Sequence, residues 1–346
     1  MIKVGLAGYG VVGKRRHHYI DLHPQMKVIA VCDQTFTEDH TASSGIKCYR
    51  NFLRLLEEPL DVLFVCMPND IAPEATIAGL EKGMHVFCEK PPGRNVADIE
   101  RVIEIEKAHP GLKLKYGFNH RYHDSIKMAL DVIGSGELGH VINIRGVYGK
   151  SRIISFEGGW RSQREIAGGG ILLDQGIHML DLMRLFCGEF VEIKSYVSNS
   201  YWNHDIEDNA YAIMKDTNGR IAMLHSTATQ WQHRFHMDIA LSEGYIELHG
   251  ILSGSKSYGE ERIVIGHRDD ESINGQMESK TINFLTDNSW KEEIFEFADA
   301  VINDKPVLSG TSNDGLETMR LVYGIYFGDS EWRDKYSISD PKQQIN

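Results

Sequence analysis

A glycine-rich turn near the start of the chain most constrains what the chain can fold into. The turn Gly8-Tyr9-Gly10-Val11-Val12-Gly13 directly follows an apolar run at Ile2 to Ala7 and precedes a helical pattern. In this context the first glycine permits a tight turn, the second admits a pyrophosphate to the backbone, and the third allows close helix–strand packing. Phosphate oxygens would then meet the N–H groups of the helix N-terminus. The turn predicts a dinucleotide-binding domain; a glycine-rich turn that binds nothing is the alternative.

The first 120 residues alternate short apolar runs with helical patterns. The apolar runs are Ile2 to Ala7, Lys27 to Cys32, Val62 to Met67, His85 to Cys88 and Lys113 to Gly117. Between the last two runs, Asn95 is placed to cap a helix. Strands that are apolar throughout are typical of a sheet buried on both faces, so we expect a doubly wound parallel sheet.

The pattern changes near residue 120. A helix is expected over 124–133, and alternating runs at 210–214 and 221–229 are joined through Asn218-Gly219, a strong hairpin signal. Helical patterns return at 290–302 and 314–327. The fold class expected is therefore α/β, with a Rossmann domain over residues 1–120 and an α+β domain with a mainly antiparallel sheet over 121–346.

Composition excludes several classes of protein. Lys and Arg total 37 against 49 Asp and Glu, a net charge of −12, so nucleic acid is not an expected partner. An apolar run at 62–68 is about seven residues long, whereas a membrane span needs about 20. The first residues lack the pattern of a secretory signal, which predicts a cytoplasmic protein. Five cysteines without a C-x-x-C pair are expected to be small core residues.

Asp33 ends the second predicted strand, 20 residues after Gly13. A carboxylate at this position can accept hydrogen bonds from a ribose hydroxyl and would repel a 2′-phosphate. The residue therefore favours NAD over NADP. The alternative is a solvated strand-end residue, in which case Lys14, Arg15 and Arg16 could assist a phosphate.

Two further motifs carry ionisable residues. The segment Cys88-Glu89-Lys90-Pro91-Pro92 follows a parallel strand at the edge where ligands bind in open α/β sheets, and the prolines hold Lys90 extended. Beyond the glycine triplet at 168–170, Asp174 and His178 are four residues apart and share a face if the segment is helical throughout. Ionisable groups near an apolar surface cost free energy unless they pair or act chemically. A surface lysine and a satisfied buried histidine are the alternatives.

Together these motifs resemble the Gfo/Idh/MocA family, named for glucose-fructose oxidoreductase, inositol dehydrogenase and rhizopine catabolism. The resemblance spans nearly the whole chain and also includes Gly117 to Tyr122 and Trp160-Arg161. It implies a Rossmann domain and an α+β domain whose open sheet packs on another subunit, hence a homodimer or homotetramer. Two positions depart from the family pattern: Ala72 stands where many relatives carry a histidine, and Arg16 stands at the usual histidine of the first helix.

The resemblance also implies roles for individual residues. The catalytic candidates are Lys90, Asp174 and His178. The cofactor-binding candidates are Gly8, Gly10, Val11, Val12, Gly13, Asp33, Met67, Pro68, Asn69, Glu89, Lys90, Asn119, Trp160 and Arg161. The substrate-binding candidates are Lys90, Arg121, Arg161, Asp174 and His178. Pro91 is expected to follow a cis peptide bond, and no metal ligand is expected.

The expected reaction transfers a hydride between the nicotinamide of NAD and a carbohydrate hydroxyl or carbonyl. His178 would be the general base, and Asp174 would orient it or bind a neighbouring hydroxyl. Lys90 would stabilise alkoxide character on the reacting oxygen. The main alternative is a catalytically silent NAD-sensing protein of the same fold. The presence of Lys90, Asp174 and His178 argues against this alternative.

The substrate class depends on a group of basic residues. They are Lys150, Arg152, Arg161 and Arg164. Such a group could bind a phosphate or a nucleotide diphosphate. Among carbohydrate substrates, it therefore favours a nucleotide sugar. A solvated face paired with Glu157 and Glu165 is the alternative.

A metal-dependent enzyme is a third possibility, because 16 histidines offer ligands. The candidate sets are Asp174, His178 and Asp181, or His233 and His236. The second set lies in a segment with strand character, where residues three apart point to opposite faces. We therefore do not expect metal catalysis.

Overall fold

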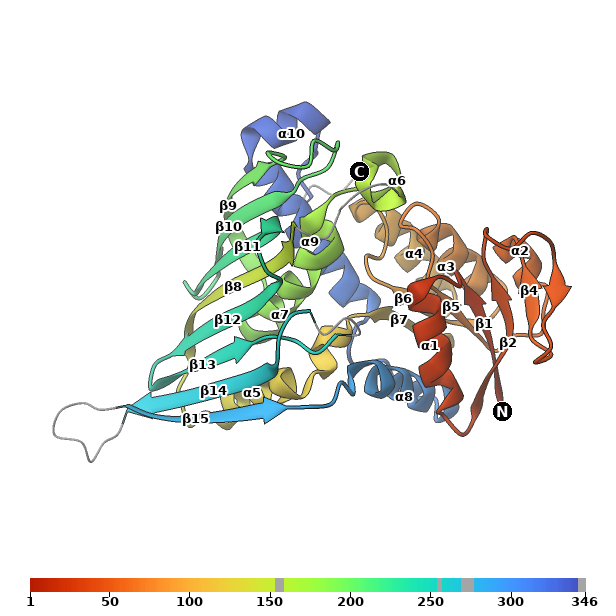
Figure 1. Cartoon of the computed structure of the whole chain (residues 1–346), viewed down its shortest axis with the longest axis horizontal. Coiled ribbons are helices and arrows are strands. Elements are labelled where there is room, and N and C mark those ends of the chain that lie inside the picture. Colours follow the sequence, from red (N-terminus) through yellow and green to blue (C-terminus); the bar gives the residue numbers. More distant parts are fainter. Residues whose placement is uncertain (153–158, 254–256, 269–276, 342–346) are drawn as a thin grey trace. The chain divides into compact units, whose positions relative to one another are not determined.

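The computed structural model describes residues 1–152, 159–253, 257–268 and 277–341 (Figure 1). The chain forms two compact units. The first contains Met1–Asn119, Glu165–Gly168 and Trp290–Met319, and the second contains His120–Arg164, Gly169–Ser289 and Arg320–Asn346. Residues 290–319, which the sequence pattern assigned to the second domain, thus pack with the first unit.

A mostly parallel sheet forms the centre of the first unit. In the described residues its order is β3-β4-β2-β1-β5-β6-β7, and only the β3–β4 pair is antiparallel. The strands are β1 (Ile2–Ala7), β2 (Met26–Cys32), β3 (His40–Thr41), β4 (Lys47–Tyr49), β5 (Val62–Val65), β6 (His85–Glu89) and β7 (Leu114–Gly117). The sheet confirms the expected Rossmann architecture.

Helices cover both faces of this sheet. They are α1 (Val11–Asp21), α2 (Phe52–Leu55), α3 (Ala72–Glu81), α4 (Val96–Ala108) and α8 (Ser289–Ile302). The helices α1 and α8 pack on one face, while α3 packs on β5 and β6 from the other and contacts α4. Asn95 caps α4 as expected, because its side chain accepts a hydrogen bond from the Asp98 N–H at 2.9 Å.

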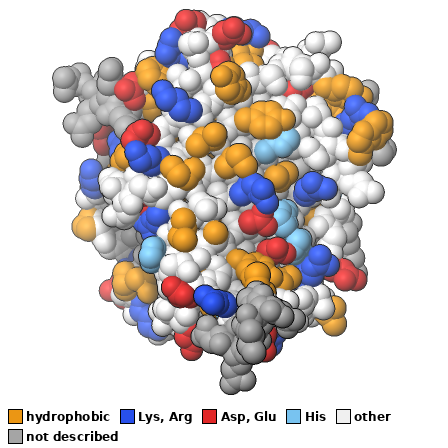
Figure 2. Space-filling model, turned by 90° about the vertical axis from the view of Figure 1, so that its left-hand side faces the viewer, with side chains coloured by type: hydrophobic (Ala, Val, Ile, Leu, Met, Phe, Trp, Pro, Cys, Tyr) orange, Lys and Arg blue, Asp and Glu red, His pale blue; other side chains and the backbone are white. Residues whose placement is uncertain are grey.

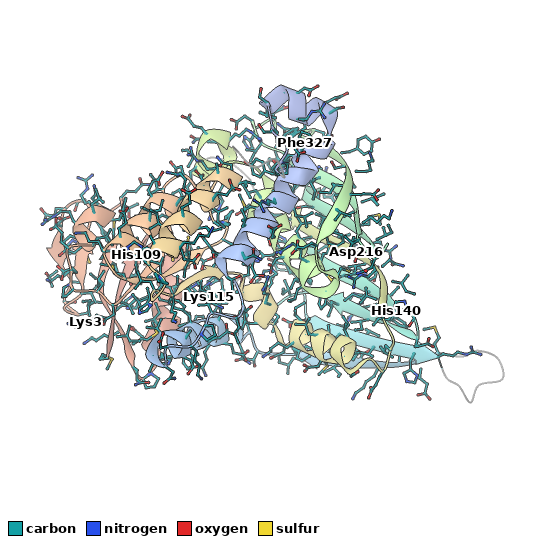
Figure 3. The ribbon with its side chains drawn as sticks, turned by 180° about the vertical axis from the view of Figure 1, so that it is seen from behind. Lys3, His109, Lys115, His140, Asp216 and Phe327 are labelled. Carbon is teal, nitrogen blue, oxygen red and sulfur yellow. The ribbon has the colours of Figure 1, made fainter. Side chains whose placement is uncertain are left out.

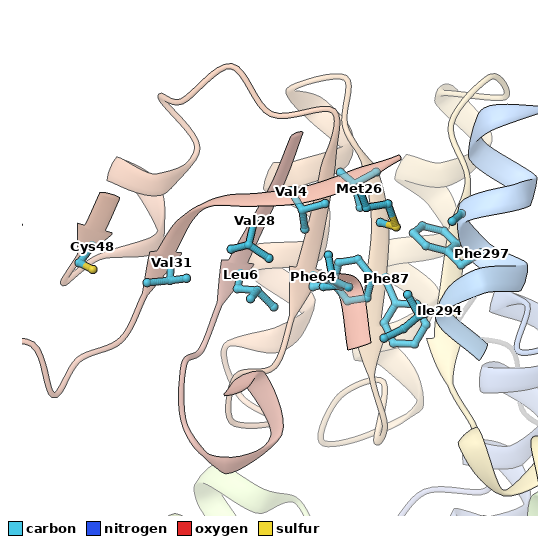
Figure 4. Packing of buried hydrophobic residues seen from close by; sticks show 13 residues of the cluster. Val4, Leu6, Met26, Val28, Val31, Cys48, Phe64, Phe87, Ile294 and Phe297 are labelled. Carbon is cyan, nitrogen blue, oxygen red and sulfur yellow. The ribbon is translucent and has the colours of Figure 1, made fainter. Parts of the chain in front are cut away.

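Three aromatic rings mark the core on the α1–α8 face (Figure 4). Phe64 of β5 stacks on Phe87 of β6 with ring centroids 4.8 Å apart. Phe297 of α8 meets both rings edge-on, at 6.0 and 5.5 Å. Ile294 and Ala298 join the same cluster. A helix from late in the chain therefore completes the core of the N-terminal sheet.

The second unit is built on a large, mainly antiparallel sheet. Its order in the described residues is β15-β14-β13-β12-β8-β11-β10-β9, with only β8 and β11 paired in parallel. The strands are β8 (Val141–Ser151), β9 (Phe190–Ser198), β10 (Asn209–Asp216), β11 (Ile221–Gln230), β12 (Arg234–Leu241), β13 (Gly244–His249), β14 (Glu261–Arg268) and β15 (Met277–Phe284). Strands β10 and β11 form the predicted hairpin, with Gly219 at φ +83°.

The other helical segments are η1 (Asn119–Tyr122), α5 (Asp124–Ser135), η2 (Trp160–Ser162), α6 (Arg164–Ala167), η3 (Leu172–Gly176), α7 (Ile177–Cys187), α9 (Ser312–Gly328) and α10 (Ser330–Tyr336). The helices α5 and α7 pack on one face of the second sheet. The five thiols are free and mostly buried, as expected for core residues. Within the described residues, none of the helices is long and apolar enough to cross a bilayer.

The opposite face of the second sheet exposes large apolar side chains. Figure 2 shows hydrophobic side chains gathered on this side of the molecule, beside charged and histidine side chains. The exposed apolar residues on strands β9 to β11 include Tyr196, Tyr211, Ile213, Ile221 and Met223. An apolar group of this kind on a sheet face is typical of an interaction surface.

Candidate active site

The glycine turn between β1 and α1 has the clearance that a dinucleotide needs. Gly8 lies at φ +93°, and a Cβ there would lie 2.3 Å from the carbonyl oxygen of Cys66. A Cβ at Gly13 would lie 2.0 Å from the carbonyl oxygen of Gly8. A Cβ at Gly10 would meet nothing within 4 Å, so the backbone is open in front of the α1 N-terminus, where Val11 and Val12 follow. These features fit a pyrophosphate at the helix N-terminus.

Asp33 lies directly after β2 and is tied to the glycine turn. Its Oδ2 accepts a hydrogen bond from the Tyr9 N–H at 2.8 Å, and its Oδ1 accepts from the Thr35 N–H and hydroxyl at 2.9 and 2.7 Å. Burial alone would raise the pKa of Asp33, but these hydrogen bonds and the Lys14 charge lower it below its usual value. The carboxylate is therefore ionised at neutral pH and fixed beside the turn.

The basic residues of α1 differ in their placement. Lys14 lies over the Tyr9 ring at 5.9 Å, and Arg15 lies over the Trp290 ring at 4.9 Å. The side chain of Arg16 is completely buried and ion-paired with Glu89. The expectation that Arg16 could assist a phosphate is therefore wrong, because its guanidinium belongs to the core.

The segment between β5 and α3 holds three of the cofactor candidates. Met67 and Pro68 are half-buried, and Asn69 is buried. The side-chain amide of Asn69 donates a hydrogen bond to the Ala167 carbonyl at 2.7 Å. Asn69 thus anchors residues 165–168 within the first unit. Asn119, another candidate, is buried at the start of η1.

Lys90 follows the last residue of β6 and is half-buried. The Lys90–Pro91 peptide bond is cis, as expected. The carboxylate of the preceding Glu89 accepts a hydrogen bond from Nε of Arg16 at 2.6 Å. The lysine thus starts a turn whose strand end is held from α1.

In the second unit, Asp174 and His178 lie in two kinds of helix. Asp174 is in η3, a single π-helical turn, and His178 is in the first turn of α7. The segment is helical at both positions, but the π turn bonds residues five apart and changes the direction of the side chains that precede α7, so the spacing of a regular α-helix does not apply between Asp174 and His178. Such turns are frequent at functional sites.

Glu207 holds the start of this helical segment. Its buried carboxylate accepts hydrogen bonds from the N–H groups of Gly170 and Leu172, at 2.7 and 2.9 Å, and from the Tyr326 hydroxyl at 2.7 Å. A Cβ at Gly169 would lie 2.3 Å from that hydroxyl, and one at Gly170 would lie 2.1 Å from the Glu207 carbonyl oxygen. The glycines therefore allow the close approach that anchors the segment carrying Asp174.

Two cations lie near Asp174. Nε of Arg161 is 3.6 Å from Oδ1 of Asp174, and the Arg161 guanidinium lies over the Trp160 ring at 4.3 Å. Burial lowers the pKa of Lys150 and the Arg161 charge lowers it further, while Asp174 opposes the shift. Trp160, Arg161 and Asp174 are thus brought together, along with Lys150.

His178 is buried against a second histidine that its sequence pattern did not reveal. The imidazole rings of His178 and His120 stack with centroids 3.7 Å apart and an interplanar angle of 13°. Nε2 of His120 lies 3.1 Å from the Tyr148 hydroxyl. His120 follows Asn119 in the motif already noted, but only the tertiary contact between η1 and α7 shows that it touches His178.

Arg121, a substrate-binding candidate, is buried in an ion pair. Its Nε and Nη2 donate to the two carboxylate oxygens of Asp181 at 2.7 and 2.6 Å, which ties η1 to α7. The ring centroids of His233 and Tyr258 lie 4.7 Å apart, whereas Nδ1 of His236 lies 3.1 Å from Nδ1 of His249. Among the residues that the structure describes, no group of three or more His, Cys, Asp or Glu side chains is placed to hold a metal ion.

The predicted basic group does not form one cluster. Arg152 lies over the Trp231 ring at 3.4 Å, and Arg164 lies over the Tyr336 ring at 4.0 Å. Of the acidic partners considered for this group, Glu157 lies outside the described residues. Arg161 lies beside the Asp174 carboxylate. The basic side chains are therefore divided among separate aromatic and acidic neighbours.

Comparison with known proteins gives matches along most of the chain. A model of an oxidoreductase family with an NAD-binding Rossmann fold matches residues 2–118, and a model of the GFO/IDH/MocA C-terminal domain matches residues 126–247. The uncharacterized oxidoreductase YrbE of Bacillus subtilis (strain 168) is 23% identical over 93% of this chain and 92% of the relative. D-glucoside 3-dehydrogenase of Escherichia coli (strain K12) is 28% identical over 65% of this chain and 70% of the relative.

Solved structures share the same fold. Levoglucosan dehydrogenase in complex with NADH superimposes with a TM-score of 0.83 at 19% identity, covering 96% of this chain and 97% of that structure. The structure of myo-inositol 2-dehydrogenase from Lactobacillus plantarum gives a TM-score of 0.75 at 21% identity, covering 94% and 96%. The likeness extends over both units, and the two family models match the two halves in order. The chain therefore belongs to the Gfo/Idh/MocA family of NAD-binding oxidoreductases.

Proposed function

We propose that this protein is an NAD-dependent dehydrogenase that acts on a hydroxyl group of a sugar or polyol. The observation that carries the proposal is the presence, in a chain of this family, of Lys90 in its cis-proline turn together with Asp174 and His178 in the η3–α7 segment. The relatives named above include a glucoside dehydrogenase, a levoglucosan dehydrogenase and an inositol dehydrogenase. The activities in the names of these proteins suggest the substrate class.

The first unit supplies the cofactor site. Gly8, Gly10 and Gly13 leave the α1 N-terminus open to the pyrophosphate, and the ionised Asp33 carboxylate would accept hydrogen bonds from an adenosine ribose. Met67 and Pro68 would line the same cleft. When bound, the nicotinamide ring accepts a hydride from a carbinol carbon or returns it to a carbonyl.

Three side chains would handle the proton and the charge. His178 takes the hydroxyl proton as the carbonyl forms, and Asp174 orients the substrate through a neighbouring hydroxyl. The Lys90 ammonium donates to the reacting oxygen and stabilises its alkoxide character, or polarises the carbonyl in the reverse direction. Arg121 is assigned a packing role instead of substrate binding, because its guanidinium is bidentate on Asp181.

The substrate proposed is an uncharged ring. A nucleotide sugar would need basic side chains gathered around its phosphates, whereas Arg152 and Arg164 stack on aromatic rings. The remaining pair, Lys150 and Arg161, lies beside Asp174. The two cations can donate hydrogen bonds to hydroxyl oxygens of the substrate, and the carboxylate can accept hydrogen bonds from its hydroxyl groups.

The test is NADH formation with NAD+ against a panel of polyols, free sugars, glycosides, sugar phosphates and nucleotide sugars. Turnover with an uncharged ring supports the proposal, and turnover only with nucleotide sugars corrects the substrate class. Binding of NAD+ is measured in parallel by fluorescence titration. Tight binding without turnover on any member of the panel favours the catalytically silent alternative.

Replacing Asp33 by asparagine is expected to weaken NAD+ binding by about 10-fold. The ratio of the affinities for NAD+ and NADP+ is expected to fall by a similar factor. Asparagine keeps the shape of the side chain but removes the charge that repels a 2′-phosphate. Titration of both cofactors measures the change, with Asp39→Asn in the exposed segment after β2 as the matched control. An unchanged ratio of the two affinities would remove Asp33 from cofactor selection.

We further propose that a second copy of this chain covers the exposed apolar face of the second sheet, as the family resemblance implies. Ile213 is 53% exposed on this face, and glutamate there would bury charge in the interface. Ile213→Glu is expected to convert the oligomer to a monomer in analytical ultracentrifugation. Leu308→Glu, an exposed apolar residue of the first unit, is the control. A wild-type chain that sediments as a monomer would contradict the proposal.

A further inference from the structure

A buried arginine with two carboxylate partners lies in the first unit, next in space to the end of β6. Nη1 of Arg16 is 2.7 Å from Oε2 of Glu293, and its Nε and Nη2 are each 2.6 Å from Oε1 of Glu89. The side chains of Arg16 and Glu293 are completely buried, and that of Glu89 is 13% exposed. Three elements, α1, β6 and α8, thus meet at one guanidinium.

The position of this guanidinium is fixed from several sides. It lies over the Phe87 ring at 4.4 Å and over the Trp290 ring at 4.3 Å. A Cβ at Gly117, the β7 partner of Glu89, would lie 3.0 Å from both Nη2 of Arg16 and Oε2 of Glu89. The rings and the glycine hold the guanidinium where its Nε donates a hydrogen bond to Glu89 and its Nη1 lies at ion-pair distance from Glu293.

The charges around Arg16 depend on one another. Burial raises the pKa of Glu293 to about 7, while Arg16 and the nearby Lys115 lower it and Glu89 raises it. Lys115 lies on β7 (Figure 3). Its side chain is itself buried, and its Nζ pairs with Glu296 of α8 at 2.9 Å. Removing one partner of a buried ion pair leaves an uncompensated charge, which costs far more than removing both.

We propose that Arg16 and Glu293 are positioning residues for Lys90. They fix the Glu89 carboxylate and therefore the end of β6, and Lys90 is the next residue along the chain. The inference rests on the role proposed above for Lys90. It gives Glu89 a role as an anchor of the turn, through a side chain held by Arg16 of α1, which in turn pairs with Glu293 of α8.

The departure from the family pattern at position 16 supports this assignment. A histidine at this position can be neutral, and a neutral imidazole carries no charge that needs a buried carboxylate. Arginine is always charged and has a five-donor fork, so a second buried carboxylate completes its pairing. Glu293 supplies that carboxylate from the α8 helix.

The test is a double-mutant cycle on Arg16 and Glu293, assayed at pH 8. Arg16→His leaves Glu89 and Glu293 facing each other without their cation, so it is expected to lower kcat by about 10- to 100-fold. Glu293→Gln leaves Arg16 paired with Glu89 and is expected to cost about 3-fold or less. The Arg16→His/Glu293→Gln double variant removes both charges and is expected to return to within about 3-fold of wild type.

Readouts other than turnover separate positioning from simple loss of structure. The KM and Kd for NAD+ are expected to stay within about 2-fold of wild type, because the pyrophosphate contacts are untouched. In the protein without cofactor, amide hydrogen exchange of residues 88–94 is expected to speed up at least 10-fold in Arg16→His and to recover in the double variant. Asp299→Asn on the same helix is the control, because the Asp299 carboxylate pairs with Lys305 at the surface, and kcat and exchange are expected to be unchanged.

Three results would overturn the inference. The first is a double variant no better than Arg16→His in kcat and in exchange, or one that fails to fold. The second is unchanged kcat in Arg16→His together with faster exchange of 88–94. The third is a drop in kcat that a proportional rise in KM for NAD+ accompanies. Full turnover by Lys90→Ala would contradict the catalytic role proposed for Lys90. The exchange measurements would still test, separately, whether Arg16 and Glu293 anchor the turn.

Discussion

Replacing Lys90 by alanine is expected to lower kcat by about 100-fold or more and to change the Kd for NAD+ by less than about 2-fold. The ammonium group would stabilise negative charge on the reacting oxygen, which develops in the transition state. The pyrophosphate site proposed at the α1 N-terminus would be built from other residues, so affinity for the cofactor is expected to be retained.

Steady-state NADH formation and fluorescence titration measure the two quantities for Lys90→Ala. Lys107→Ala is the matched control, because Lys107 is an exposed lysine in the last turn of α4. A variant that keeps wild-type kcat would remove Lys90 from the reaction. A variant that loses NAD+ affinity to the same extent as kcat would assign the lysine to cofactor binding instead.

His178→Asn is expected to lower kcat by about 100- to 10,000-fold, the range that a general base contributes. Asparagine is a smaller planar group with no titratable nitrogen, so it can occupy the buried position beside His120 but cannot accept the proton. The loss of rate on the acid side of the kcat/KM profile is expected to disappear with the base.

Steady-state rates across pH, with thermal unfolding in parallel, measure this effect. His267→Asn is the control, because His267 lies exposed on β14. An acid limb that persists in His178→Asn at unchanged kcat would show that another group takes the proton. A large fall in unfolding temperature with normal kcat would mark His178 as a packing residue stacked on His120.

The features that sequence patterns predicted are those with local causes. The glycine turn, the cap at Asn95 and the Asn218-Gly219 hairpin each follow from backbone chemistry within a few residues. The parallel strands follow from runs such as Val62 to Val65 that are apolar on both faces. Each of these features can therefore be predicted from a short stretch of the sequence that contains it.

The features that sequence patterns did not reveal depend on distant partners. In the sequence, Arg16 has the pattern of a solvated helix residue. In the folded chain its side chain is buried between Glu89 and Glu293. Glu207 meets the glycine triplet from 37 residues away, and the wide turn at Leu172–Gly176 has no signal of its own. Each is a polar or strained feature whose cost is offset only by tertiary contacts, which no periodicity records.

The packing of α8 on the N-terminal sheet has a consequence for synthesis of the chain. At about 5 to 20 residues per second, a ribosome adds α8 about 10 to 35 s after it has completed β7. Throughout this interval the aromatic pair Phe64 and Phe87 lacks Phe297, and the Arg16 guanidinium lacks one of its two carboxylates. The nascent N-terminal half therefore emerges with an open apolar face, and closure of its core waits for the synthesis of α8 even though its strands come first.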